Sequence, residues 1–323
     1  MNRKQIISVA LIIIAIVVMA LIPLMTKNDS TINLVILVLL YMTIASSWNI
    51  LGGYTGQTNL GHAAFFGVGS LTARLLWIGG FPLFPSFLAG GIVAVVLGLL
   101  IGIPAFKLKG VYFAIGTLAL AQILNITVGN ILPEMSYNPA ISDYQLVPRY
   151  YLFLGLTIIT IGSAYFLVNS RWGLGMMAVR EGEDAAESLG ISALKHKLLA
   201  LSVSAFFAGL AGSAFAYYHV SYYLSMPFSP EWTFDPMMMA YIGGTGTIIG
   251  PIIGSVFFVG LKQLLVWNVG EYHLIIFGVL FILIVLFLPG GLVEAWKKIQ
   301  KLVARRFRQK NNAPQVVSSN HRS

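Results

Sequence analysis

The stretch that decides the fold is residues 84–105, FPSFLAGGIVAVVLGLLIGIPA, an apolar run without a charged side chain. A helix needs about 20 such residues to cross the hydrocarbon of a bilayer. Runs of this kind recur along the chain, at residues 5–25, 32–50, 60–78, 84–105, 111–132, 149–168, 198–218, 236–250, 251–268 and 274–289. The sequence therefore predicts an all-α membrane protein, a polytopic helical bundle of about ten transmembrane or membrane-embedded segments.

The composition excludes several other classes of protein. The mean hydropathy is +0.83, and charged residues make up 10% of the chain against 57% apolar residues, which is outside the range of soluble domains. The chain has no cysteine, which excludes disulfides, thiol catalysis and Cys-ligated metals. Its 5 histidines lack the spacing of a metal-binding motif, so we expect neither a metal nor another cofactor.

The distribution of basic residues predicts the orientation. With both termini in the cytoplasm, the cytoplasmic loops and tail hold 16 of the 20 Lys and Arg residues, which is the positive-inside pattern. The net charge of +9 is then a topology signal, and we expect no nucleic-acid partner. The first apolar run is too long for a signal peptide and has no cleavage site, so we take it as the first span. We divide the chain into a transmembrane domain, 1–290, and a basic cytoplasmic tail, 291–323, which begins as an amphipathic helix at the membrane surface.

One cytoplasmic loop differs from the rest. The polar segment, residues 169–197, reads NSRWGLGMMAVREGEDAAESLGISALKHK and lies between two apolar runs. Its centre predicts a short amphipathic helix over 180–189, bracketed by Gly182 and Gly190, with Gly190 ending the helix in a left-handed turn. Such a helix is unstable alone in water and needs a surface to lie on. A lipid surface favours lysines on the polar face, whereas this helix carries four acids, so a groove on a protein partner is the preferred interpretation.

Two glycine-rich breaks are candidates for the lining of a pathway. The first, 52–62, offers the hydrogen-bonding side chains of Gln57, Thr58, Asn59 and His62. Non-helical backbone at membrane depth is tolerated only where it lines a cavity or is buried in protein. The alternative interpretation is a cytoplasmic turn between closely packed helices. The second break, 243–251, poses the same choice between small residues for helix crossing and a pathway lining.

Charged residues within the apolar runs are few. Arg74 lies near the outer end of its run and could extend to the interface, whereas Lys262 is more central and is the better pathway candidate, or a contact with a second membrane subunit. All acidic residues are expected in loops or the tail. Those on the outer face are either solvated or a docking surface for an extracytoplasmic partner, and prolines including Pro230 and Pro236 are expected to stop the flanking helices.

Four blocks of the sequence resemble, in the same order, the branched-chain amino acid permeases of ABC importers, of the LivM type. They are GGYTGQTNLGHAAFFGVGS (52–70), KLKGVYFAIGTLALAQI (107–123), the region 173–216, and GGTGTIIGPIIG (243–254) with LFLPGGL (286–292). Within the third block, Asp184-Ala-Ala-Glu-Ser-Leu-Gly190 is similar to the acidic-Ala-Ala…Gly pattern of the helix that such permeases present to their ATPase. Arg74 departs from the family, which usually has a small residue there.

The resemblance implies a function that residue patterns alone do not. It implies a permease domain over 1–290 in a bacterial cell membrane, a sister permease subunit, two cytoplasmic ATPase subunits and an extracytoplasmic substrate-binding protein. It also assigns ATPase coupling to a set of residues in the polar segment: Arg180, Glu181, Glu183, Asp184, Ala185, Ala186, Glu187 and Gly190. The chain has no G-x-x-x-x-G-K-[ST] motif, so the ATP site is expected on a partner and the subunit itself is not expected to be an enzyme.

Other functions remain open at this point. Related permeases carry urea, short amides or sugars, so the substrate class has alternatives. A secondary transporter would need a buried carboxylate or paired ions for coupling, and the expected placement of all acids in loops counts against it. An intramembrane enzyme would need a nucleophile or metal set, and neither an HExxH nor a GxSxG motif occurs.

Overall fold

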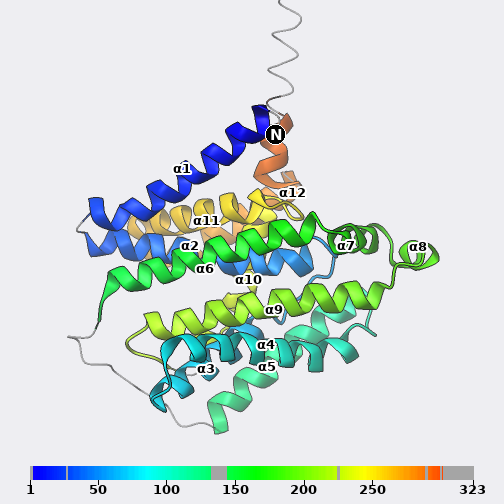
Figure 1. Cartoon of the computed structure of the whole chain (residues 1–323), viewed down its shortest axis with the longest axis horizontal. Coiled ribbons are helices and arrows are strands. Elements are labelled where there is room, and N and C mark those ends of the chain that lie inside the picture. The colour runs from blue at the N-terminus through cyan, green and yellow to red at the C-terminus, as the bar shows by residue number, and fades with distance from the viewer. Residues whose placement is uncertain are drawn as a thin grey trace, which may run out of the picture.

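The chain folds into a bundle of α-helices (Figure 1). The computed structural model describes residues 3–26, 28–131, 144–223, 226–287, 290–298 and 300. The helices are α1 (Arg3–Met25), α2 (Asp29–Gly52), α3 (His62–Ile78), α4 (Leu83–Ala105), α5 (Val111–Ile131), α6 (Leu146–Val168), α7 (Arg171–Glu181), α8 (Glu183–Ser188), α9 (Ala193–Tyr218), α10 (Glu231–Gly243), α11 (Ile249–Val269) and α12 (His273–Phe287), with short 3₁₀ turns at Met226–Phe228 and Gly270–Tyr272. Within these ranges there is no strand, which confirms the all-α prediction.

Within the described residues, six helices are long and apolar enough to cross a membrane by themselves: α2, α4, α5, α6, α9 and, over Ile249–Val266, α11. The predicted run 236–250 does not form one helix. Helix α10 ends at Gly243, residues 244–248 are non-helical, and α11 begins at Ile249. Pro236 lies inside α10 instead of stopping it, which corrects the expectation from the sequence; α10 begins directly after Pro230.

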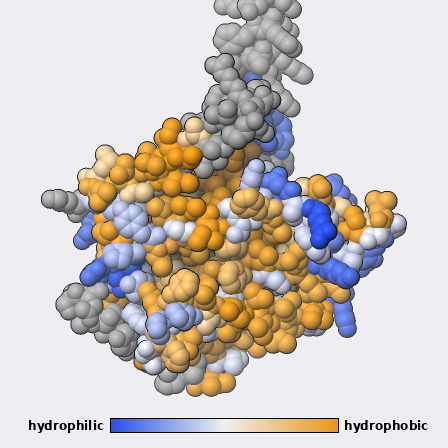
Figure 2. All heavy atoms as spheres, in the orientation of Figure 1, coloured by the Kyte–Doolittle hydropathy of each residue, from blue (hydrophilic) through white to orange (hydrophobic). Residues whose placement is uncertain are grey.

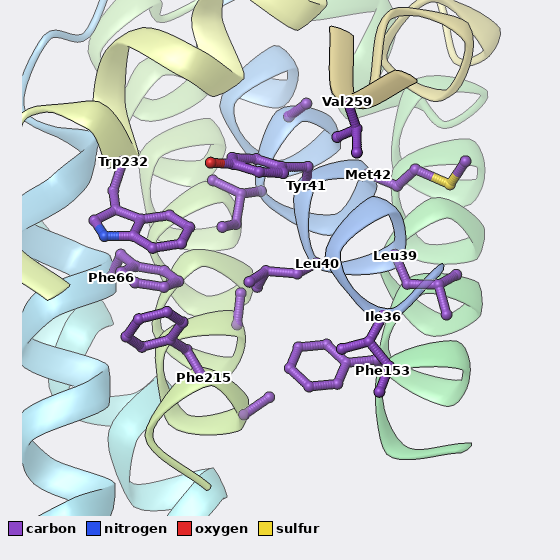
Figure 3. Close-up of a cluster of buried hydrophobic side chains, with 14 of the residues drawn as sticks. Ile36, Leu39, Leu40, Tyr41, Met42, Phe66, Phe153, Phe215, Trp232 and Val259 are labelled. Atoms are coloured by element: carbon purple, nitrogen blue, oxygen red, sulfur yellow. The ribbon is translucent and has the colours of Figure 1, made fainter. Parts of the chain in front are cut away.

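Two helices organise the bundle. Helix α2 is central, with 78% of its apolar window buried, and packs against α6, α9, α10 and α11. Helix α9 packs on its other sides against α3 and α4 (Figure 1). Rings and aliphatic side chains from these helices fill the space between them, including Ile36, Phe66, Phe153 and Phe215 (Figure 3). The apolar cover over the outer helices, seen as orange in Figure 2, suits contact with lipid.

Glycines let the helices approach closely. A Cβ at Gly212 of α9 would lie 2.0 Å from the carbonyl oxygen of Phe66 in α3, and one at Gly243 would lie 1.7 Å from that of Gly250. No other residue fits at these crossings, which is the packing typical of membrane helices. The small residues of 243–251 therefore act in helix crossing, the first of the two interpretations offered by the sequence.

Arg74 and Arg149 are buried inside the protein. The Arg74 guanidinium donates to the carbonyl oxygens of Ala216 (2.8 Å), His219 (3.3 Å) and Val220 (3.2 Å) at the C-terminal end of α9. Arg149, in the first turns of α6, donates to Tyr217 O at 3.1 Å and lies over the Tyr217 ring. A cation bound to the last carbonyls of a helix complements its dipole. Arg74 thus anchors α9 instead of extending to the interface.

Candidate functional site

The polar segment (169–197) folds as two helices joined at Gly182. Helix α7 starts after Ser170, whose hydroxyl accepts bonds from the N–H groups of Trp172 and Gly173, and it runs to Glu181. Helix α8 covers only Glu183–Ser188. Arg180 and Glu181 therefore belong to the end of α7, which corrects the prediction of one helix over 180–189. The stop at Gly190 is confirmed, since its φ is +82°.

Helix α8 is held against α9 by a charge and a small apolar contact. The Lys197 ammonium of α9 donates to Glu183 Oε2 at 2.5 Å, and its side chain is only 3% exposed. Ala186 is buried against Val179 and Ala193, which lie on the flanking helices. A six-residue helix has no stability of its own, so these contacts fix its position.

The other side of α8 faces outward. Asp184, Ala185, Glu187 and Gly190 are exposed, as is Leu189 at 80%. The nearest basic partner, Lys109, lies 3.8 Å from Asp184 with both side chains in solvent, so this pair adds little stability. In Figure 1, α7 and α8 project from one end of the bundle, and Figure 2 shows hydrophilic residues gathered there. The segment thus presents an acidic surface with an apolar tip.

Arg180 points the opposite way, into the bundle end. Its guanidinium donates to the Gly53 carbonyl oxygen at 2.6 Å, directly after α2. It also lies so close to Gly246 that a Cβ there would be 2.1 Å from the Arg180 Nη1. Arg180 therefore contacts both glycine-rich breaks, 53–61 and 244–248, at once.

The same two breaks are joined by Asn49 in the last turn of α2. Its side-chain amide donates to Thr247 O and accepts from Gly246 N–H, both at 2.9 Å. Together with Arg180, these bonds connect the polar segment to the ends of α2, α10 and α11. A displacement of α7 would therefore act on three helices through a few polar contacts.

Residues 53–61 return from the bundle end into its interior without forming a helix. Thr55 and Asn59 are buried, and Leu60 N–H donates to Thr117 of α5. The first residues of α3 lie deeper still, because Ala63 N–H donates to Thr233 in the first turn of α10. Non-helical backbone at this depth survives because protein surrounds it.

The four pathway candidates of this break occupy two kinds of environment. Asn59 Oδ1 accepts from Gly61 N–H, and His62 Nε2 lies 3.0 Å from Ser47 Oγ, so both side chains pack inside the subunit. Gln57 and Thr58 are half-buried and nearer the surface. The structure therefore separates Asn59 and His62, which are engaged in internal bonds, from Gln57 and Thr58.

Lys262 has an acidic partner. Its ammonium lies 3.4 Å from Asp235 Oδ2 in α10, and the same oxygen accepts from the Tyr41 hydroxyl of α2 at 3.1 Å. The expectation that every acid lies in a loop or the tail is wrong for Asp235. The expectation fails because it treats Pro236 as a helix stop, whereas Pro236 lies inside α10. No sequence spacing signals this cluster, since its three members come from three separate helices.

A groove lies beside Arg180 where the C-terminal tail begins. It measures about 420 Å³ and is lined by Arg180, Thr245, Thr247, Gly290, Val293, Glu294 and Lys297. A hydrogen bond from Lys298 lowers the pKa of Glu294 below its usual range. Residues 291–298 are helical, as predicted for the start of the tail, whereas residues 301–323 lie outside the described part.

Taken together, the helices of membrane-spanning length and the acidic segment at one end define a multi-pass helical protein of the cell membrane. The family follows from sequence comparison. Residues 30–285 match the family described as "Branched-chain amino acid transport system / permease component", and the chain belongs to it. It is thus, at the level of the family, a transport permease component.

Individual relatives agree with this assignment. The chain is 26% identical to the high-affinity branched-chain amino acid transport system permease protein LivM of Escherichia coli, over 90% of this chain and 76% of the relative. It is 24% identical to a probable LivM of Methanocaldococcus jannaschii, over 79% and 90%. It is also 28% identical to the autoinducer 2 import system permease protein LsrC of Yersinia pseudotuberculosis, over 66% of each chain. No solved structure matches the chain.

Proposed function

We propose that this chain is the permease subunit of an ABC importer and forms part of the membrane pathway for leucine, isoleucine and valine. It pairs with a sister permease, two cytoplasmic ATPase subunits and an extracytoplasmic binding protein. The names of the LivM relatives support the substrate class. The observation that carries the coupling role is the exposed acidic face of α8, fixed to α9 through Lys197.

We further propose ten membrane-embedded segments with both termini in the cytoplasm. Contacts at the helix ends support this topology. Arg180 meets Gly53 and Gly246, and Gly244 lies against Gly290, so four segments that should be cytoplasmic meet at one end. At the other end, Tyr218 at the end of α9 donates to Asn33 at the start of α2.

In the proposed mechanism, closure of the ATPase dimer moves α8. The motion passes to α9 through the Lys197–Glu183 pair and to the ends of α2, α10 and α11 through Arg180 and Asn49. Rigid displacement of packed helices can then switch the pathway between outward-facing and inward-facing states.

A charge reversal on the outer face of α8 tests the coupling role. Asp184→Lys with Glu187→Lys changes only exposed side chains, so insertion and folding should be retained. ATP-driven leucine uptake by the reconstituted complex should fall at least tenfold, while basal ATP hydrolysis persists. The neutral variant Asp184→Asn with Glu187→Gln is the matched control and should fall less. Unchanged uptake in the reversed variant would contradict the assignment.

The alternatives are separated by the same reconstitution. Uptake of urea, a short amide or a sugar in place of leucine would change the substrate class, and the LsrC relative makes that comparison worthwhile. Accumulation driven by an ion gradient, with the chain alone in vesicles, would identify a secondary transporter instead.

A further inference from the structure

The cluster of Asp235, Lys262 and Tyr41 lies well inside the bundle. Tyr41 is near the middle of α2, 11 residues before Gly52, which is about 16 Å along the helix axis. Lys262 is 13 residues after Ile249, about 20 Å from the cytoplasmic end of α11. Asp235 lies just after the start of α10, which begins inside the bundle next to the first turn of α3. The cluster is therefore close to the depth of the bilayer centre.

Its exposure is unusual for charges at that depth. The Lys262 side chain is 34% exposed and that of Asp235 is 14% exposed. A lysine facing hydrocarbon near the bilayer centre is costly, and such residues face a bundle interior or a water-filled cavity. The face of α11 that bears Lys262 must therefore open onto water or a partner subunit, not onto lipid.

The cluster is held in a rigid frame. The Tyr41 ring stacks on Trp232 with centroids 5.7 Å apart, and Trp232 stacks on Phe66 at 4.3 Å (Figure 3). This stack fixes the direction of the Tyr41 hydroxyl, which donates to Asp235 Oδ2. The Lys262 ammonium contacts the same oxygen at 3.4 Å. In the described part of the chain, both contacts of the carboxylate use Oδ2.

We propose that Asp235, Lys262 and Tyr41 form a binding site for the charged ends of a zwitterionic amino acid on its way through the membrane. This inference rests on the proposed function and names a site for its substrate. The α-ammonium binds Asp235, the α-carboxylate binds Lys262, and the Tyr41 hydroxyl is a further donor. Four charges of alternating sign then lie side by side, so the two protein charges need to part only slightly.

The net charge of the site matches that of a zwitterionic substrate. The protein pair and the amino acid each have a net charge of zero, so the occupied site needs no ion from outside. Met238 and Leu265, three residues after Asp235 and Lys262 respectively, share their helix faces and give an aliphatic side chain an apolar surface.

Direct binding tests the site without the binding protein. The full chain, assembled with its partner subunits in nanodiscs, is observed by saturation-transfer NMR with millimolar leucine, leucinol or 4-methylpentanoate. Leucinol lacks the carboxylate and 4-methylpentanoate lacks the ammonium, so both should give at least fivefold weaker signals than leucine. Asp235→Asn with Lys262→Met should reduce the leucine signal to that of the analogues, and equal signals in both proteins would overturn the proposal.

Uptake with the binding protein provides the second readout. Because the binding protein sets the apparent affinity, the double variant should keep KM and lose at least tenfold in kcat, while loaded binding protein still stimulates ATP hydrolysis. Tyr41→Phe keeps the stack and should lose less. If the wild-type complex imports no leucine, the proposed function fails. If it does import leucine but the double variant keeps its kcat, the site is refuted and the function stands.

Discussion

Two lysine–carboxylate pairs in this subunit have the same chemistry in different surroundings. The Lys197 side chain is 3% exposed, and its ammonium lies 2.5 Å from Glu183 Oε2. This closed pair holds α8 against α9. Lys262 is 34% exposed and lies 3.4 Å from Asp235. A closed pair resists separation and can transmit displacement, whereas an accessible pair can exchange its partner for a ligand. Burial, and not residue type, separates the two proposed roles.

The largest effect is expected at the Lys197–Glu183 pair. The loss of stability should differ according to which of the two residues is replaced. Glu183→Gln leaves the Lys197 ammonium buried without a counter-charge and should lower the free energy of unfolding by about 3 kcal/mol. Lys197→Met leaves a carboxylate that is 32% exposed and can reach water, so it should cost about 1 kcal/mol. Unfolding of the purified chain in detergent, followed by helix signal against denaturant or temperature, measures both.

Equal losses in the two variants would contradict the closed pair. The matched control is Asp184→Asn, whose carboxylate is 93% exposed and should change stability by less than about 0.5 kcal/mol. Glu183→Asp keeps the charge but shortens the side chain, and it should fall between the wild type and Glu183→Gln.

The sequence predicts much of the fold because apolar length and glycine stops are local signals. Each predicted apolar run except 236–250 falls on one helix over its described residues, and the turn at Gly190 lies where its residue type requires. The predicted helix over 180–189 is wrong in one respect: the chain breaks at Gly182, so Arg180 and Glu181 belong to α7. Gly182 separates α7 from α8, and Ala186 of α8 packs on Val179 and Ala193.

The site could be predicted only in part, because its contacts join distant positions. Arg180 and Gly53 are 127 residues apart, and Tyr41 and Asp235 are 194 residues apart. Such pairs depend on how helices are rotated and on where a re-entering segment begins, which no local pattern encodes. The prediction for Pro236 is wrong for the same reason. Whether a proline is tolerated within a helix such as α10 depends on tertiary packing.

Arg180 connects α7 to both glycine-rich breaks, and its substitution is the subject of the next prediction. Arg180→Met removes the bond to Gly53 and the contact with Gly246, so motion of α7 should no longer reach α2 and α10. ATP-driven leucine uptake should fall about tenfold, equivalent to about 1.4 kcal/mol in the transport barrier. Arg171→Met, at the exposed start of the same helix, is the control and should leave uptake unchanged. A similar loss in both variants would show that α7 needs positive charge in general, and that the Gly53 bond transmits nothing.

The smallest effect is expected at the accessible pair, and it decides whether the two pairs differ at all. Asp235→Asn leaves Lys262 with about a third of its side chain exposed in the isolated chain, so the ammonium can hydrate there and the free energy of unfolding should fall by about 1 kcal/mol or less. The same detergent unfolding experiment gives the value, with Asp235→Glu as the control that keeps the charge. A loss as large as that of Glu183→Gln would mean that Lys262 is sealed in its environment. Lys262 would then have only a structural role. A lysine that cannot hydrate when its carboxylate partner is removed cannot bind a substrate carboxylate either.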